Sequence, residues 1–283
     1  MRQKDKVCGK RRFFTGLRWV SVAMTALSVL ALLTVIVYIF AEGADKISLH
    51  LLFGAYETAA PKIFTAFAGK HTRNLLSCAI AVHRGIASAV FLTEYANNNG
   101  SLVRIIRVAT ETLAGIPSIV YGLFGYIVFV VTCGWRYTLL GGGLTLALMI
   151  LPVIVRSTEE SLLAVPVSYR EGAYALGAGK VRTIFRIVLP AASGGILTGI
   201  ILAIGRVISE SAVLIITVGM VVDKLPGGLL SPGTSLALDI YFFASHGYPD
   251  AAAATAVVLL VFVFLINLLA GLVGKAMKRK AGK

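Results

Sequence analysis

Charged side chains are scarce in this chain of 283 residues, of which 14% are charged and 57% are hydrophobic. A soluble domain usually carries about 25% charged residues. The shortage, together with long apolar runs, excludes an ordinary soluble domain and favours an integral membrane protein. Acidic residues are scarcest, at 13 against 27 Lys and Arg. The basic residues cluster beside the apolar runs without interleaved aromatic residues, which argues against nucleic acid as a partner.

Cysteine is also rare. The three cysteines, Cys8, Cys78 and Cys133, are far apart in the sequence and lack the spacing of metal ligands. They exclude a disulfide framework, and we expect no metal site.

A nucleotide-binding loop is lacking, although "ALGAGK" within residues 169–190 is similar to one. If Gly179 and Lys180 were the G-K pair of a P-loop, residue 174 would be glycine and residue 181 a hydroxyl residue; they are Tyr174 and Val181. The chain is therefore not expected to bind or hydrolyse ATP.

Six apolar runs are long enough to cross a bilayer, which takes about 20 residues. We therefore predict an all-α integral membrane protein with six transmembrane helices. The first run lacks a clear cleavage site, so we expect an uncleaved anchor. The predicted spans are about 17–41, 74–93, 107–132, 143–163, 191–218 and 249–274.

Lys and Arg are unevenly divided between the connections. Nineteen lie in the N-terminal tail, the second and fourth connections and the C-terminal tail, against six in the alternate connections. Cytoplasmic loops carry the excess of positive charge. Both termini are therefore predicted to be cytoplasmic, with basic tails at 1–16 and 275–283.

The second span is unusual because His83 and Arg84 interrupt its apolar middle. Charges at that depth usually face protein or water and mark function. A local break in the helix or atypical packing explains the pair equally well.

The connection 166–190 is predicted to hold two short helices. The first starts near Tyr169, Gly177 and Gly179 favour its termination, and the second covers about 180–188. Such a segment could lie on the bilayer surface or dock into the groove of a soluble partner. Physical reasoning alone leaves both open.

The same connection resembles the Glu-Ala-Ala loop of ABC importer membrane subunits, with the type I permease fold. The family pattern is E-A-A, three residues, G, nine residues, I-x-L-P; Gly172 departs from it. The resemblance implies a coupling helix that rests in a cleft of a separate ATPase. The residues at matching positions are Glu171, Ala173, Gly177, Ile187, Leu189 and Pro190.

Three further stretches, 110–126, 151–166 and 189–212, are similar to the phosphate-specific permease family, and 225–247 to its A-type subunit. The resemblance implies four kinds of partner: a C-type permease subunit, an ATPase dimer, an extracytoplasmic phosphate-binding protein and membrane lipid. No cofactor is expected on this chain, because the partner uses the ATP. The location would be the inner membrane.

Arginine inside an apolar run suggests an anion path. Arg206 lies mid-run, and Glu210 follows at i+4, so we expect Glu210 to hold Arg206 in one state and phosphate to replace it in another. A structural ion pair is the alternative. The resemblance implies that Arg156, Glu159 and Arg206 matter for phosphate passage. Without it, Arg156 would be a topology anchor and Glu111 a helix-end charge.

The predicted organisation places the first span and an extracytoplasmic connection at 17–73 and the permease core at 74–274. The chain would be a non-enzymatic half of a permease pair. Three alternatives remain open: an importer of another oxyanion such as molybdate, sulfate or phosphonate, an ion-coupled secondary carrier, and a membrane scaffold.

Overall fold

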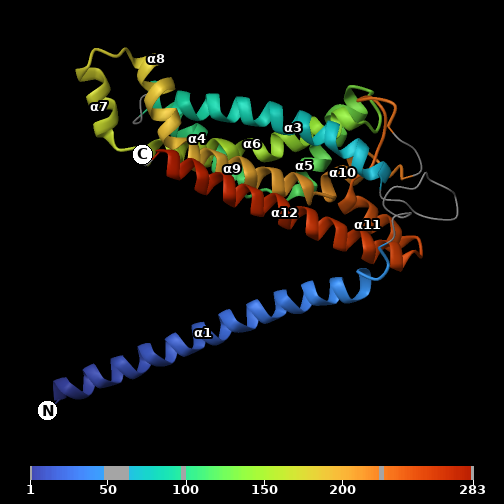
Figure 1. The fold of residues 1–283 in the computed structure, drawn as a ribbon, viewed down its shortest axis with the longest axis horizontal. Helices are drawn as coiled ribbons and strands as arrows, with labels where there is room; N and C mark the ends of the chain where they lie inside the picture. Colours follow the sequence, from blue (N-terminus) through green and yellow to red (C-terminus); the bar gives the residue numbers. More distant parts are fainter. Residues whose placement is uncertain (1, 48–63, 97–99, 223–225, 282–283) are drawn as a thin grey trace.

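The computed structural model describes residues 2–47, 64–96, 100–222 and 226–281 of the chain. No β-strand occurs in these residues, which fold almost entirely into helices (Figure 1). The helical elements are α1 (Arg2–Gly43), α3 (Phe64–Val90), the π-helical turn η1 (Phe91–Tyr95), α4 (Ser101–Ala114), α5 (Ser118–Gly125), η2 (Tyr126–Thr132), α6 (Leu139–Leu163), α7 (Val167–Ala175), α8 (Lys180–Thr183), η3 (Ile184–Val188), α9 (Leu189–Ile208), α10 (Ala212–Thr217), α11 (Leu236–Ser245) and α12 (Pro249–Ala281).

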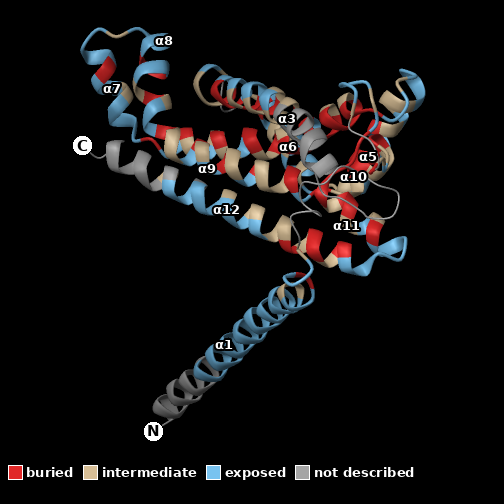
Figure 2. Cartoon of the chain, turned by 45° about the vertical axis from the view of Figure 1, so that its right-hand side comes forward, coloured by how far each residue is buried: buried red, intermediate tan, exposed pale blue. Residues whose placement is uncertain are grey.

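Helix α6 is the centre of the bundle. It packs against α3, α4, α5, α9 and α10, and α12 packs on the outer side of α9. Two apolar clusters form along it, one around Ile150 and Leu214 and another around Leu162 and Ile184. Figure 2 shows the buried residues concentrated where these helices meet. The bundle therefore has two ends: the α7 end, where α7 and α8 protrude, and the α10 end opposite.

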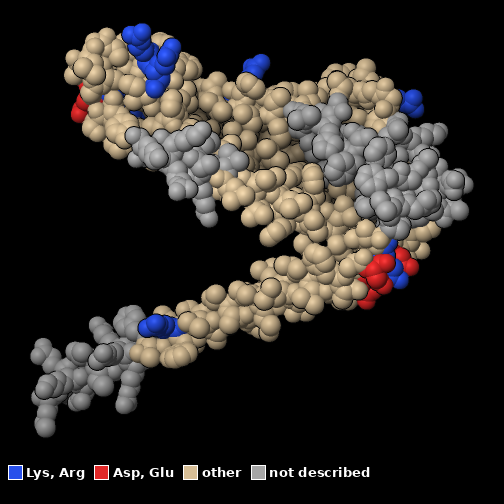
Figure 3. All heavy atoms as spheres, viewed as in Figure 1, with Lys and Arg blue, Asp and Glu red and all other residues tan. Residues whose placement is uncertain are grey.

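The predicted all-α fold is confirmed. Five helices are long and apolar enough to cross a membrane, and a sixth crossing is formed if the bent pair of α4 with α5 and η2 counts as one. The long sides of the molecule in Figure 3 show few charges, as a surface in contact with lipid requires. Part of the predicted connection 42–73 lies outside the described residues.

The third predicted span, 107–132, is not one straight helix. Its two halves are bent by 102° at the break around Gly115 to Pro117. Pro117 disfavours helix in Ile116, the residue before it, and α4 therefore ends ahead of this point. Pro117 itself is extended and precedes the first residue of α5. Pro152, a second proline inside a predicted span, lies within the bounds of α6 and does not divide that helix.

The fifth predicted span, 191–218, is also divided. Helix α9 begins earlier, at Leu189 and directly after η3, and ends at Ile208. The chain resumes as α10 only at Ala212. The break contains Ser209, Glu210 and Ser211, and serine side chains compete with helical backbone bonding.

Helix α1 leaves the bundle. Its apolar segment Thr15–Gly43 is exposed along its length, and Figure 1 shows it diverging from the other helices. It touches α12 at its C-terminal end, where Gly43 lies against Ala253 and Lys46 pairs with Asp250 at 3.4 Å. The backbone of the predicted tails is helical, since α1 starts at Arg2 and α12 continues to Ala281.

Candidate functional site

The connection between α6 and α9 folds into two helical segments that protrude from one end of the bundle (Figures 1 and 2). The second segment, α8 with η3, covers 180–188 as predicted. The first, α7, begins at Val167 rather than near Tyr169. Pro166 fixes an extended entry with φ −55° and ψ 138°, so the helix starts at the next residue.

Gly177 ends α7 as predicted. It adopts φ +77°, a left-handed conformation that glycine reaches without a Cβ clash. The Gly177 N–H donates to Tyr174 O at 2.9 Å, and the Ala178 N–H donates to Ala173 O at 3.0 Å. This paired arrangement satisfies the last carbonyls of the helix and turns the chain sharply toward α8.

The predicted coupling residues divide between two faces. Ala173 is buried, and Ile187 and Leu189 are half-buried. Glu171, Gly177 and Pro190 are exposed. The inner residues hold the connection against the bundle, and the outer ones remain available to a partner.

An apolar surface remains uncovered on the outer side of the connection. Leu176 has an exposed fraction of 90%. Apolar patches of this kind mark interaction sites. We call it the coupling surface; its residues are Val167, Tyr169, Tyr174, Leu176, Val181 and Phe185, all exposed.

A network of ion pairs joins α4 to α6 near the same end. Arg107 Nε donates to Glu159 Oε1 at 2.6 Å. Arg156 donates from Nη1 to Glu111 and from Nε to Glu160, both at 3.0 Å. Arg156 is thus shared between two carboxylates, while Glu159 points toward α4 and is only 12% exposed.

Arg206 and Glu210 do not form the expected ion pair in the described structure. The expectation assumed one continuous helix, but α9 ends at Ile208, so the i+4 geometry is lost. The Glu210 carboxylate instead accepts from the Val213 N–H at 3.2 Å at the start of α10 and is buried. Arg206 is half-buried and close enough to Tyr121 for an electrostatic interaction.

A groove of about 620 Å³ lies between α6, α9 and the start of α7. Glycines let α9 lie close to α6 along it, because a Cβ at Gly195 or Gly199 would collide with Ser161 or Ser157. Leu202, one turn before Arg206, also lines the groove. We call it the α6–α9 groove. Its polar lining comes from Ser157, Glu160, Ser161, Tyr169 and Thr198.

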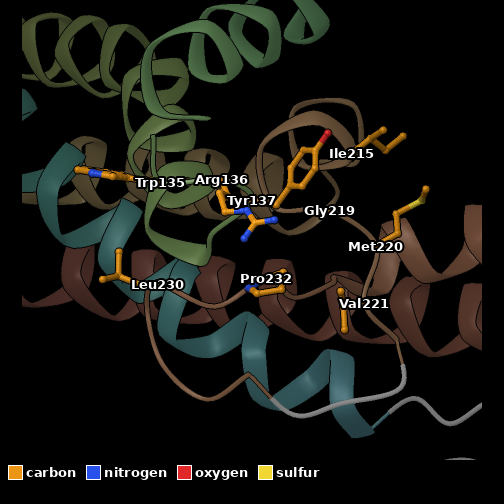
Figure 4. Close-up of a pocket in the computed structure, with 9 residues that line it drawn as sticks. All are labelled: Trp135, Arg136, Tyr137, Ile215, Gly219, Met220, Val221, Leu230 and Pro232. Carbon is orange, nitrogen blue, oxygen red and sulfur yellow. The ribbon is translucent and has the colours of Figure 1, made fainter. Parts of the chain in front are cut away.

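A second pocket, of about 600 Å³, lies at the α10 end (Figure 4). Its wall includes Trp135, Arg136 and Tyr137 from one loop and Gly219 to Val221 from another. Arg136 has φ 60°, a left-handed conformation uncommon for a side chain with a Cβ. The subunit therefore has cavities near both ends.

His83 and Arg84 lie on the surface of α3. Both are exposed, whereas Gly85 next to them is buried against Ile154 of α6. The His83 ring Nδ1 lies 2.7 Å from Ala79 O within its own helix. The helix is not broken at this point, so the suggested local break is not observed.

Several residues of the site were not predicted from the sequence. Arg107 and Glu160 are the partners of Glu159 and Arg156, and a further ion pair joins Arg170 to Glu94. The two residues of each pair are far apart in the sequence, except for Arg156 and Glu160, which are four positions apart on α6. That spacing was the one signal available in the sequence. No group of three His, Cys, Asp or Glu that could hold a metal occurs in the described part of the chain.

Known proteins are similar to this chain in sequence and in fold. The chain is 36% identical over 217 residues to the probable ABC transporter permease protein YqgI of Bacillus subtilis, covering 71% of this chain and 74% of that protein. It is 35% identical to the phosphate transport system permease protein PstA 1 of Mycobacterium tuberculosis, covering 79% and 74%.

Two solved structures have the same fold. A bacterial alginate ABC transporter chain aligns with a TM-score of 0.67 at 15% identity, covering 89% of this chain and 92% of that one. A chain of the MetNI methionine ABC transporter aligns with a TM-score of 0.60 at 20% identity, covering 74% and 93%.

The helical bundle with a protruding connection between two spans defines a multi-pass membrane permease subunit of an ABC importer. Residues 85–279 match the family described as binding-protein-dependent transport system inner membrane component, and the chain belongs to that family.

Proposed function

We propose that the chain is the A-type subunit of a phosphate importer, forms half of the translocation path and receives the work of a separate ATPase. The observation that carries the proposal is the coupling surface, an exposed apolar patch on a connection with the family's Glu-Ala-Ala spacing. The similarity to phosphate transport system permease proteins such as PstA 1 supports phosphate as the substrate.

The α6–α9 groove supports a path that needs a second subunit. It is open on one side, and it is lined at one end by Tyr169 of α7. Arg206 follows Leu202 on the same face of α9, so it extends the line of the groove toward the bundle interior. A C-type permease subunit would close the open side. Phosphate would then pass between the two subunits.

Arginine suits the proposed cargo. A guanidinium presents planar donors that match phosphate oxygens, and it stays charged at any physiological pH. Arg206 is half-buried, and no carboxylate among the described residues forms an ion pair with it. Arg156 is more exposed and held by Glu111 and Glu160, so an anion would compete with those carboxylates. Glu159 would act indirectly, by fixing Arg107.

The orientation follows from the Lys and Arg count. The α7 end and both termini would be cytoplasmic, and the pocket at the α10 end would face the phosphate-binding protein. ATP would close the ATPase dimer, the coupling surface would move with it, and the path would change sides. This chain would bind no cofactor.

Reconstitution into liposomes tests the proposal. The chain is assembled with its C-type partner, ATPase and binding protein, and uptake of labelled phosphate is measured with and without ATP. We expect ATP-dependent uptake that survives ionophores and resists competition by sulfate, molybdate and phosphonate. Uptake that collapses with the ion gradient would identify a secondary carrier, and stronger competition by another anion would identify that anion as the substrate.

A further inference from the structure

Arg170, on the inner side of α7, binds three separate parts of the chain. Its Nη2 and Nε donate to Glu94 Oε1 at 2.6 and 3.1 Å. Its Nη1 donates to Val165 O at 3.1 Å, and Nη2 also donates to Leu162 O at 3.1 Å. The guanidinium therefore joins α7 to η1 at the end of α3 and to the C-terminal turn of α6. We call this arrangement the Arg170 junction.

The junction is largely shielded from solvent. The Glu94 side chain is 7% exposed and that of Arg170 is 18% exposed. A buried ion pair is retained only where the remaining donors and acceptors are satisfied, and removal of one partner leaves an uncompensated charge. Here the carbonyl groups at the end of α6 accept the remaining donors, in a position where a cation is favoured by the helix dipole. The geometry is thus fixed rather than adaptable.

The second segment of the connection reaches the same turn. Lys180 Nζ, at the start of α8, lies 4.8 Å from the centre of the Tyr95 ring. Tyr95 is the residue after Glu94, and both belong to η1. Both segments of the coupling connection therefore contact one π-helical turn at the end of α3. Single π-helical turns recur at functional sites because they redirect side chains within a helix.

We infer that Arg170 is a positioning residue that makes α7, the end of α3 and the end of α6 move as one body. A displacement of the coupling surface would then reach the second and fourth spans directly. Val188 and Ile196 carry the same displacement into α9 through the apolar cluster that includes Leu162. The inference rests on the proposed function and adds the link by which motion at the ATPase reaches two spans of the membrane region.

The test compares phosphate moved with ATP hydrolysed in reconstituted complexes. Glu94→Gln keeps the shape of the side chain and removes its charge. A charge-assisted hydrogen bond is strong enough that we expect phosphate moved per ATP to fall at least about tenfold. Recovery of the ATPase with the membrane complex should stay at the wild-type level, because the coupling surface is intact. The double variant Glu94→Gln with Arg170→Gln should be no worse than either single variant.

Arg104→Gln is the matched control, because Arg104 is an exposed basic residue on α4 outside the junction. It should leave the ratio unchanged. If the ion pair only stabilises the fold, its loss lowers the amount of complex, phosphate uptake and ATP hydrolysis in proportion. The ratio of phosphate moved to ATP hydrolysed then stays unchanged, and that result would overturn the inference. Should Glu94→Gln prevent assembly, Glu94→Asp keeps the charge on a shorter side chain, and a wild-type ratio there would overturn it as well.

Failure of the proposed function is visible separately in the wild-type complex. Wild-type vesicles that hydrolyse ATP but move another anion would contradict phosphate as the substrate, and the ratio is then measured with that anion. Wild-type vesicles without ATP-driven transport would contradict both proposals at once, whereas a change confined to the variants concerns the Arg170 junction alone.

Discussion

Two arginines near the α7 end have carboxylate partners but lie in different surroundings. Arg156, beside the α6–α9 groove, is 52% exposed, and its partners Glu111 and Glu160 are exposed as well. The side chains of Arg170 and Glu94 are only 18% and 7% exposed, and Arg170 also donates to Leu162 O at the end of α6. Exposed pairs contribute little and open readily, whereas buried pairs are costly to break. The first arrangement suits exchange with a passing anion, and the second suits a fixed mechanical connection.

The largest expected effect comes from breaking the buried pair. Arg170→Met leaves the Glu94 carboxylate buried and unpaired, which should destabilise the protein by about 3–5 kcal/mol. The measurement is the midpoint of thermal unfolding of the purified chain in detergent. A midpoint equal to that of the wild type would show that Glu94 is solvated and that the two arginines do not differ as described.

Arg206→Gln tests the anion path. Losing a charge-assisted contact of about 1.5–3 kcal/mol should lower phosphate uptake roughly 10- to 100-fold. The amount of protein in the membrane should stay normal, because Arg206 forms no ion pair with a carboxylate among the described residues. Normal uptake at normal abundance would remove Arg206 from the path. Tyr121→Phe changes a residue near Arg206 without a change of charge and serves as the comparison.

Gly172→Ala tests whether the departure from the family pattern has a structural reason. A Cβ at Gly172 would meet nothing within 4 Å. Glycine in a helix interior is about 0.5–1 kcal/mol less favourable than alanine, so the variant should be stabilised by that amount. The thermal midpoint should rise slightly and uptake should be unchanged. A fall in uptake would show that α7 must be loose to work.

Glu160→Gln should have the smallest effect on stability, because Glu111 still holds Arg156. We expect a change of at most about 1 kcal/mol, as for other exposed pairs. Thermal unfolding of the variant and the wild type is measured at low and high salt. The difference between their midpoints should be smaller at high salt, because salt screens exposed charges. A loss as large as that of Arg170→Met would contradict the distinction between the two regions.

The sequence predicted those parts of the structure that depend on local pattern. Apolar length located the spans, and residue spacing located the coupling connection with Gly177 at its turn. Pro117 indicated a kink in the third span, but neither its size of 102° nor the break at 209–211 was predicted, since a helix interrupted within the bundle has the same apolar composition as a continuous one. The break after Ile208 is also why the Arg206–Glu210 pair is not formed in this structure.

Ion-pair partners depend on tertiary packing and were mostly hidden in the sequence. Glu94 and Arg170 are 76 positions apart, and Arg107 and Glu159 are 52 apart. The order of side chains around α6 decides that Glu159 faces α4 while Glu160 faces the groove. Helical register would have predicted that these two neighbours diverge, but not which of them meets Arg107.

Under the proposed function, the connection between α6 and α9 docks on a separate ATPase and moves with it. The most direct measurement is ATPase recovery with the membrane complex, together with ATP-driven phosphate uptake, in the variant Glu171→Ala with Gly177→Val. Valine cannot adopt the left-handed turn at 177 without strain, so the exposed coupling surface should be displaced. Recovery of the ATPase with the membrane complex and phosphate uptake should both fall, while the chain remains at its normal level in the membrane. Wild-type recovery and uptake in that variant would contradict the proposed function.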